Sequence, residues 1–207
     1  YESGYSIASD SSDHLYITGY TEGSFKGSRN KGRGDIILFK FNSSGDQKWL
    51  IQFGSEGDDH SYDIATDTSG NVYIGGYTNG TLLEGQNKMG LYDVFLAKFD
   101  SSGKNLWIRQ FGTSEDDIAY GIATDSSDHV YITGYTKGGL HNHSNLGSGD
   151  IFVSRFDPLG NHKWTQQIGS SQDDQGFDIV TDRNDMIYIT GETKGNLEPQ
   201  LNTQENK

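Results

Sequence analysis

Short runs of apolar and β-branched residues, separated by clusters of Asp, Ser and Gly, recur along the whole chain. One unit contains four such runs, YDIATD, NVYIGGYT, DVFLAKFD and LWIRQFG. β-Branched and aromatic residues dominate each run, which is typical of β-strands, and no stretch keeps a helical period. The clusters DTSGN and DSSGK join the first run to the second and the third to the fourth, so we expect two antiparallel hairpins in each unit.

The runs are apolar on both faces and return at a nearly constant interval. In the second run of the first unit, Leu15 and Ile17 oppose Tyr16 and Tyr20, so both faces of the sheet need cover. Equivalent tyrosines follow one another after 57, 58 and 57 residues, at Tyr16, Tyr73, Tyr131 and Tyr188. A unit of this length with four strands favours a β-propeller, in which neighbouring blades supply the cover. A β-solenoid, with units of roughly 20–30 residues, is the competing architecture.

The predicted fold is therefore all-β, a β-propeller of four-stranded antiparallel blades of about 57 residues. Blade 1 is expected at residues 1–54, blade 2 at 55–112, blade 3 at 113–169, and the first half of a fourth blade at 170–207. Such a partial ring leaves strand edges open. We expect a second copy, or further sequence of a longer parent chain, to complete it.

Three long motifs carry a resemblance to a known repeat family. They are D-x-x-G-N-x-Y-I-x-G-Y-T, N-x-x-G-x-x-D-x-F-L-x-K-F-D-x-x-G and W-x-x-Q-F-G. The chain resembles the SBBP (seven-bladed β-propeller) repeat and, more distantly, NHL and quinoprotein repeats. The resemblance implies a scaffold from a bacterial surface or secreted protein, hence an extracellular or cell-surface location, and no single activity. It also implies that the first strand of each unit is innermost, so that short turns share one rim, and crossovers and long loops share the other.

The charge and the absence of cysteine exclude several classes of function. Sixteen Lys and Arg against 29 Asp and Glu give a formal charge of −13, which disfavours nucleic acid and anionic membrane surfaces as partners. Without cysteine there is no disulfide, no zinc–thiolate site and no thiol catalysis. No apolar run is long enough to cross a bilayer, so membrane insertion is not expected.

The long loops between the second and third strands are the predicted recognition surface, because loop variety concentrates there. A basic run, FKGSRNKGRG, a polar tip in the second loop and an H-x-H pair in GGLHNHSN supply the candidate ligand-binding residues, which are Lys26, Arg29, Lys31, Leu83, Glu84, Gln86, His141 and His143. The alternative for the basic run and for the H-x-H pair is a solvated loop. Two repeated positions are expected to pin the loops, one apolar at Phe25, Leu82, Leu140 and Leu197, and one amide at Asn30, Asn87, Asn145 and Asn202.

Pairs of aspartates recur in the crossover segments between blades, near the expected mouth of the central channel. They are Asp58–Asp59, Asp116–Asp117 and Asp173–Asp174. Paired carboxylates could bind Ca²⁺ as a cofactor, or could act as acid and base, and no other cofactor is expected. The alternative is structural, with one member accepting backbone N–H groups, and it is favoured because a catalytic site is normally built once, not in every repeat.

Two further repeated positions have a structural interpretation. Asp35, Asp93 and Asp150 open the third strand and are expected to fix the long loop as buried carboxylates. Trp49, Trp107 and Trp164, on the outer strand, are expected to dock between blades.

Three functions remain open from the sequence. The first is a non-enzymatic scaffold that binds a protein or glycan through the long-loop rim. The second is an enzyme or a Ca²⁺-dependent site at the paired aspartates. The third is a structural or assembly module whose open edges join neighbours.

Overall fold

The computed structural model describes residues 1–25 and 27–197; Lys26 and residues 198–207, with Asn202 and the end of the fourth expected blade, lie outside the described part. The strands are β1 (Glu2–Ser9), β2 (Leu15–Thr21), β3 (Asp35–Phe41), β4 (Gln47–Phe53), β5 (Asp59–Thr66), β6 (Val72–Thr78), β7 (Asp93–Phe99), β8 (Asn105–Phe111), β9 (Asp117–Thr124), β10 (Val130–Thr136), β11 (Asp150–Phe156), β12 (His162–Ile168), β13 (Asp174–Thr181) and β14 (Ile187–Thr193). The one helical element in this part is a short 3₁₀ turn, η1 (Leu140–Asn142). None of the described helices is long and apolar enough to cross a membrane.

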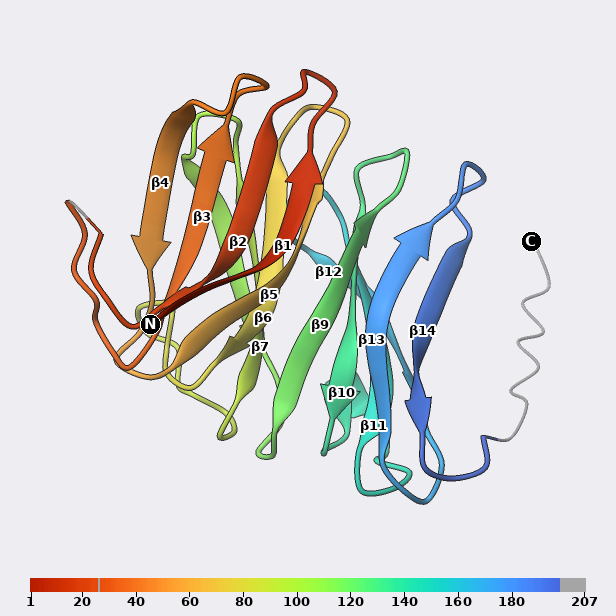
Figure 1. Ribbon diagram of the computed structural model, residues 1–207. Coiled ribbons are helices and arrows are strands. Elements are labelled where there is room, and N and C mark those ends of the chain that lie inside the picture. Colours follow the sequence, from red (N-terminus) through yellow and green to blue (C-terminus); the bar gives the residue numbers. More distant parts are fainter. Residues whose placement is uncertain (26, 198–207) are drawn as a thin grey trace.

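The strands form three four-stranded sheets and one two-stranded sheet, all antiparallel and in chain order. The sheets are β1–β4, β5–β8, β9–β12 and β13–β14. Figure 1 shows them side by side, with β1, β5, β9 and β13 adjacent along one side. These four are the inner strands, as expected. The prediction of an all-β, partial β-propeller is confirmed.

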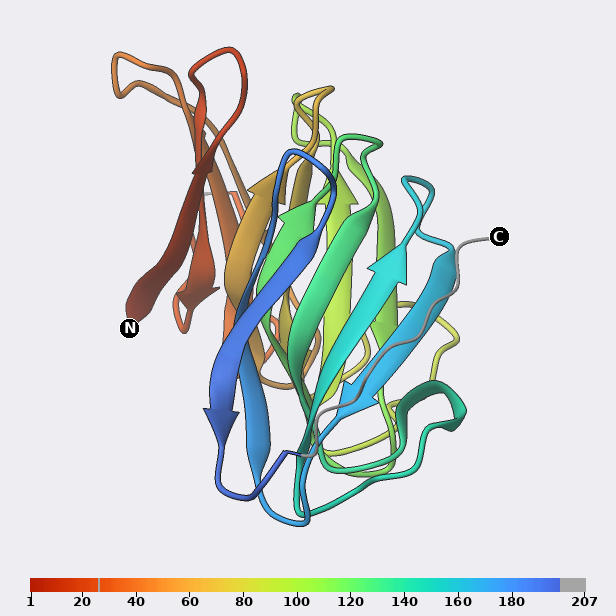
Figure 2. The ribbon, with the colours of Figure 1, turned by 90° about the vertical axis from the view of Figure 1, so that its right-hand side faces the viewer.

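The connections divide between two rims. Figures 1 and 2 show the short hairpin turns at one end of the sheets and the longer connections at the other. The first end, the hairpin rim, carries the turns 10–14, 67–71, 125–129 and 182–186 between first and second strands. The second end, the long-loop rim, carries the long loops 22–34, 79–92 and 137–149 and the crossovers 54–58, 112–116 and 169–173. The predicted distribution of turns and loops is therefore the one observed.

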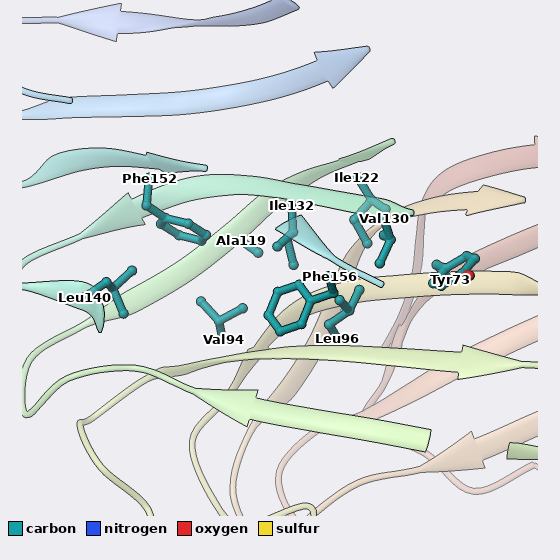
Figure 3. Close-up of a cluster of buried hydrophobic side chains, with 10 residues drawn as sticks. All are labelled: Tyr73, Val94, Leu96, Ala119, Ile122, Val130, Ile132, Leu140, Phe152 and Phe156. Carbon is teal, nitrogen blue, oxygen red and sulfur yellow. The ribbon is translucent and has the colours of Figure 1, made fainter. Parts of the chain in front are cut away.

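The hydrophobic core lies between the sheets, not within any one of them. The cluster in Figure 3 joins the second and third sheets, and its members are Tyr73, Val94, Leu96, Ala119, Ile122, Val130, Ile132, Leu140, Phe152 and Phe156. Equivalent clusters join the first sheet to the second and the third to the fourth. Burying one such side chain contributes about 1.5–3 kcal/mol, so each blade depends on its neighbours for stability. This dependence explains why the runs are apolar on both faces.

The outer strands are fastened by a tryptophan. The indole N–H of Trp49 on β4 donates to the carbonyl oxygen of Ser101 in the next blade over 3.3 Å, and Lys40 Nζ donates to the same oxygen over 3.0 Å. Gly103, in the same turn, has a φ of 88°, and a Cβ there would lie 3.2 Å from the Trp49 ring. For Trp49, the expected docking between blades thus includes a hydrogen bond, and the turn glycine leaves room for the indole.

Candidate functional site

One glutamine of the fourth strand holds each long loop. In the second blade, Gln110 Oε1 accepts the N–H of Leu82 over 3.0 Å. Its Nε2 donates to the carbonyl of Gly80 and to Asp93 Oδ2, each over 2.9 Å. Gln52 and Gln167 make the same three contacts in their blades. The base of each loop is therefore fixed to the outer strand.

A buried aspartate fixes the far end of each loop. Asp93 is fully buried and accepts the N–H groups of Met89 over 3.0 Å and Gly90 over 2.8 Å. Asp150 accepts the N–H of Leu146 over 2.7 Å in the same way. The expected role of these carboxylates is the one seen. Together, glutamine and aspartate give the loops a rigid frame, which leaves the residues between free to vary.

The sequence pattern did not reveal the glutamine anchor and favoured asparagines for the amide role. Asn145 does bind its own loop, donating to the carbonyls of Lys137 over 2.8 Å and Gly147 over 2.9 Å. The signal for the glutamine was its fixed place three residues after each tryptophan in W-x-x-Q-F-G. Of the apolar anchors, Leu140 is fully buried, whereas Leu197 is 40% exposed.

The candidate ligand-binding residues fall in three separate places on the long-loop rim. Arg29 and Lys31 line one cavity of about 540 Å³ together with Gln52 and Glu56, while Lys26 lies outside the described residues. Leu83, Glu84 and Gln86 lie at the tip of the second long loop, in the next blade. The structure thus brings Arg29 and Lys31 together but does not join them to the histidine pair of the third loop.

The histidine pair fastens its loop to the outer strand. His141 Nδ1 lies 2.7 Å from Thr165 Oγ1, and His143 Nε2 lies 2.9 Å from the Thr165 carbonyl. The ring of His162 stacks on His141 at a centroid distance of 3.9 Å. Burial, with His162 and His143 nearby, lowers the pKa of His141 to about 4. The loop is thus bound to the outer strand through both histidines, although the His141 side chain stays exposed to solvent.

The two members of each aspartate pair lie in different surroundings. Asp59 is fully buried and accepts the N–H of Ser55 over 2.6 Å, its hydroxyl over 2.9 Å, and the hydroxyl of Thr78. Burial is the largest influence on its carboxyl group and raises the pKa. Asp117 and Asp174 are buried alike and accept from Thr113 and Ser170. These carboxylates tie each crossover to the blade that follows.

The first member of each pair stays at the rim beside a basic side chain. Asp58 is 3.1 Å from His60 Nε2, Asp116 is 2.7 Å from Lys137 Nζ, and Asp173 is 2.9 Å from Lys194 Nζ. The two carboxylates of a pair therefore do not converge on a shared point. Within residues 1–25 and 27–197, no group of three or more Asp, Glu or His side chains is arranged to hold a metal ion.

A row of aromatic rings along the inner strands was not anticipated. Tyr5, Tyr62, Tyr120 and Phe177 follow one another across the four inner strands, with centroid distances of 5.0, 5.3 and 6.1 Å. The two end members are the most open, with 46% of Tyr5 and 44% of Phe177 exposed. We call this row the axial aromatic row. It lies on the side of the sheets where an axis of the propeller would pass.

Each member of the axial aromatic row sits in a β-bulge. The pairing of β1 with β2 shifts between Gly4 and Ser6, which leaves Tyr5 without an opposite residue, and the other three inner strands shift at the same place. Bulges re-aim side chains. A Cβ on Gly19, opposite the bulge, would lie 1.9 Å from the Ser3 carbonyl oxygen, so only glycine fits there. The glycine of the Y-I-x-G-Y-T motif thus permits the bulge that presents the ring.

A second layer of rings supports the row and extends it toward the long-loop rim. The His60 ring stacks on Tyr20 at 3.7 Å and on Tyr77 at 5.0 Å, and Tyr77 meets Tyr92 at 4.8 Å. Burial lowers the pKa of His60, which favours its neutral form in this stack. Burial also raises the pKa of Tyr120 to about 12, so its hydroxyl stays protonated at neutral pH.

Carboxylates follow two of the rings directly in the inner strands. Asp63 accepts the hydroxyl of Ser6 over 2.6 Å and the N–H of Ile122 over 2.7 Å, which joins three blades, and Asp178 occupies the equivalent place in β13. Burial raises the pKa of Asp63. The row thus combines aromatic faces with acidic groups, a surface that suits neutral or cationic ligands better than anions.

Comparison with known proteins agrees with this architecture. The β-propeller repeat family SBBP matches residues 48–84, 106–141 and 163–198. The chain belongs to this family. Each matched segment begins near the outer strand of one blade and runs through the crossover and the first two strands of the next. The matched unit therefore contains the buried aspartate, the bulge and the glycine opposite it.

Two curated relatives and one solved structure are similar to this chain. The regulatory protein FlaEY of Caulobacter vibrioides is 28% identical over 149 residues, covering 68% of this chain and 15% of its own length. The uncharacterized WD repeat-containing protein L264 of Acanthamoeba polyphaga mimivirus is 22% identical over 181 residues, covering 69% of this chain and 13% of its own length. The chain thus spans a small part of either relative.

A protein of unknown function from Bacteroides caccae has a similar structure, with a TM-score of 0.53, 10% identity, and coverage of 91% of this chain and 53% of its own. At that identity the likeness shows the fold alone. By name, one of the two curated relatives is a regulatory protein and the other is a WD repeat-containing protein.

Proposed function

We propose that this chain is a non-enzymatic binding scaffold whose ligand surface runs from the long-loop rim onto the axial aromatic row. The observation that carries the proposal is the bulge, because every inner strand gives up regular pairing to aim an aromatic ring at the same surface. Tyr5 and Phe177 are large apolar side chains left nearly half exposed. Exposed aromatic groups on a rigid frame are the usual anchors of a recognition surface.

The chemistry of the surface points to a protein or glycan partner that is neutral or basic. Aromatic faces pack against the apolar faces of sugar rings and attract Lys or Arg through cation–π contacts. Asp63 and Asp178 beside the rings, with a formal charge of −13 for the whole chain, repel anions. An extracellular or cell-surface setting in a bacterium forms part of this proposal and rests on the family alone.

The absence of an enzymatic role forms part of the same proposal. In each aspartate pair one carboxylate is occupied by crossover hydrogen bonds and the other by a basic neighbour. Acid–base catalysis requires both groups to be free to exchange protons with one bound substrate, which these separate surroundings do not favour. The three pairs also share one arrangement, as expected of a structural device.

Calorimetric titration with two defined probes tests the proposal. One probe is a basic decapeptide of alternating Lys and Gly, and the other is a neutral linear hexasaccharide of glucose. We expect one of them to bind, and the double variant Tyr62→Ala/Tyr120→Ala to weaken that binding by about tenfold or more. Leu106→Ala, which removes an exposed apolar side chain from the outer strand β8, is the matched control. Binding that is indifferent to the tyrosines, or no binding of either probe, would refute the proposal.

A further inference from the structure

The three interfaces between neighbouring blades use the same residues in the same places. A tyrosine from the second strand of one blade and an isoleucine from the inner strand of the next share a buried cluster. The pairs are Tyr16 with Ile64, Tyr73 with Ile122, and Tyr131 with Ile179. All six are at most 5% exposed.

A hydroxyl contact accompanies each of these pairs. Thr66 donates to the carbonyl oxygen of Ser9 in the preceding blade over 2.9 Å. Thr124 donates to the carbonyl of Thr66 over 2.9 Å, and Thr181 to that of Thr124 over 2.7 Å. The inner strands are thus joined by a ladder in which the later blade is always the donor.

A third contact joins the turns of the hairpin rim. Thr68 donates its N–H and its hydroxyl to Asp128 of the next blade, over 2.9 and 2.8 Å. Ser126 makes the same two contacts with Asp185, over 2.9 and 2.8 Å. Both acceptors have left-handed backbone, with φ of 61° and 60°. In the second blade the equivalent residue is Gly70, so the turn of the first blade meets no side-chain acceptor there.

The two ends of the array expose what the interior buries. Ile7 on β1 is 60% exposed, although its equivalents Ile64, Ile122 and Ile179 are at most 5% exposed. Tyr188 on β14 is 54% exposed, although its equivalents are at most 4% exposed. Figure 1 places β1 and β14 toward opposite ends of the row of sheets. Within one chain these two faces do not meet.

The two end faces also carry opposite charges, at the acceptor position of one turn and the donor position of the other. Asp13 has the same left-handed backbone as the two acceptor aspartates, with φ of 59°. Arg183 occupies the donor position of Thr68 and Ser126 in its own turn. Among the described residues neither Asp13 nor Arg183 takes part in an ion pair. The first blade therefore offers an acidic acceptor, Asp13, and the last described blade offers a basic donor, Arg183.

We propose that a second copy of this chain docks head to tail, with the β13–β14 face of one copy on the β1–β2 face of the other. Tyr188 then packs on Ile7, the Ser9 hydroxyl donates to the Thr181 carbonyl, and Arg183 pairs with Asp13. Made at both ends, this contact closes two copies around a two-fold axis. The inference goes beyond the proposed ligand binding and does not depend on it.

Sedimentation equilibrium of the whole chain tests the assembly. We expect a mass of twice 22.9 kDa at concentrations of tens of micromolar. Arg183→Asp places a second negative charge next to Asp13 of the other copy. The repulsion should raise the dissociation constant of the dimer by about tenfold or more. Adding Asp13→Asn removes that repulsion and should recover most of the loss, because asparagine tolerates the left-handed backbone. Lys48→Asp, an equal charge change on an exposed position of β4, is the control and should have no effect.

A substitution in the apolar part completes the test. Ile7→Asp should abolish the pair without unfolding the chain, because that side chain is already exposed in a single copy. Circular dichroism checks that the fold is kept. A single-chain mass of 22.9 kDa for the unaltered protein would overturn the proposal and assign these faces to other repeats of a longer polypeptide. A dimer whose dissociation constant is unchanged by Arg183→Asp and by Ile7→Asp would overturn the proposal as well. This holds whatever the outcome of the ligand titrations.

Discussion

Trp107 donates its indole N–H to the carbonyl oxygen of Pro158 in the neighbouring blade, over 3.1 Å, and Lys98 Nζ reaches the same oxygen. The guanidinium of Arg109 lies 5.3 Å from the centre of the indole ring and donates to Gly160 of the same turn over 2.7 Å. One turn thus accepts several donors from the blade before it. The outer edges of the blades are held by this contact, while the inner edges are held by the threonine ladder.

We expect Trp107→Phe to lower the free energy of unfolding by about 0.5–1.5 kcal/mol, the usual net value of one hydrogen bond. Trp164→Phe should cost less, because its indole N–H has no acceptor of this kind among the described residues. Urea denaturation followed by fluorescence measures both. Equal losses at the two positions would show that packing of the ring, not the carbonyl of Pro158, is what matters.

The glycine opposite each bulge should be intolerant of any side chain. A Cβ on Gly76 would lie 1.9 Å from the carbonyl oxygen of His60, so Gly76→Ala must displace backbone. We expect a loss of roughly 3 kcal/mol or more, or failure to fold. Gly4→Ala, whose Cβ would meet Ile17 at an ordinary 3.4 Å, should cost much less. Thermal melting of the two variants compares them, and similar melting temperatures would remove the steric argument for the glycine.

The long loops should loosen when their glutamine is removed. Gln110→Ala deletes three hydrogen bonds at the base of residues 79–92, and it leaves buried Asp93 with fewer donors. We expect a loss of about 1–3 kcal/mol, with faster amide exchange confined to that loop. Gln86→Ala at the exposed tip is the control. If exchange in the loop stays slow in Gln110→Ala, the frame does not depend on the glutamine.

The third loop should become less stable in mild acid. His141 has a folded-state pKa of about 4, below its ordinary 6.5, because burial and then the neighbouring His162 and His143 disfavour its charged form. As the pH falls below 6.5 the unfolded segment binds the proton first, so stability is lost between pH 6.5 and about 4. Amide protection factors of residues 137–149 at pH 7 and pH 5 should show this loss. His141→Gln should reduce the difference, and burial of His162, which also lowers its pKa, accounts for the remainder. A loop equally protected at both pH values would contradict the assignment.

Removal of divalent cations should leave the protein unchanged. The buried oxygens of Asp59 and Asp117 accept hydrogen bonds from the crossovers, and Asp116 is paired with Lys137. We therefore expect the same melting temperature with EDTA and with millimolar Ca²⁺. A rise of several degrees with Ca²⁺ would restore the metal hypothesis for the aspartate pairs.

Much of the architecture could be read from the spacing of residues. Tyr16 and its equivalents define the repeat, and the DTSGN and DSSGK turns indicate which strands pair and which rim carries the loops. The axial aromatic row was missed for a physical reason. A bulge shifts register by one residue, so the alternation of residues along an inner strand such as β5 does not reveal which way the ring at the bulge points. The spacing of Tyr5, Tyr62 and Tyr120, which is 57 and then 58 residues, could be read from the sequence, but the direction of their side chains could not.

The roles of individual polar residues were harder to predict. The sequence favoured asparagines as loop anchors, because it shows which residues recur but not how far a side chain reaches. Gln110 reaches from the outer strand to the loop base and to Asp93, which are far from it in the chain. His141 and His143 meet Thr165 in another strand, and nothing in GGLHNHSN indicates that partner.

Because each blade contacts its neighbour through an equivalent tyrosine, isoleucine and threonine, the blades are interchangeable at these contacts. Gene duplication or unequal recombination that adds or deletes one whole unit leaves the tyrosine, isoleucine and threonine contacts of each junction in place. Such arrays can therefore change their length in evolution without new contacts, and diversity accumulates in the loop tips, where no neighbour has to be satisfied.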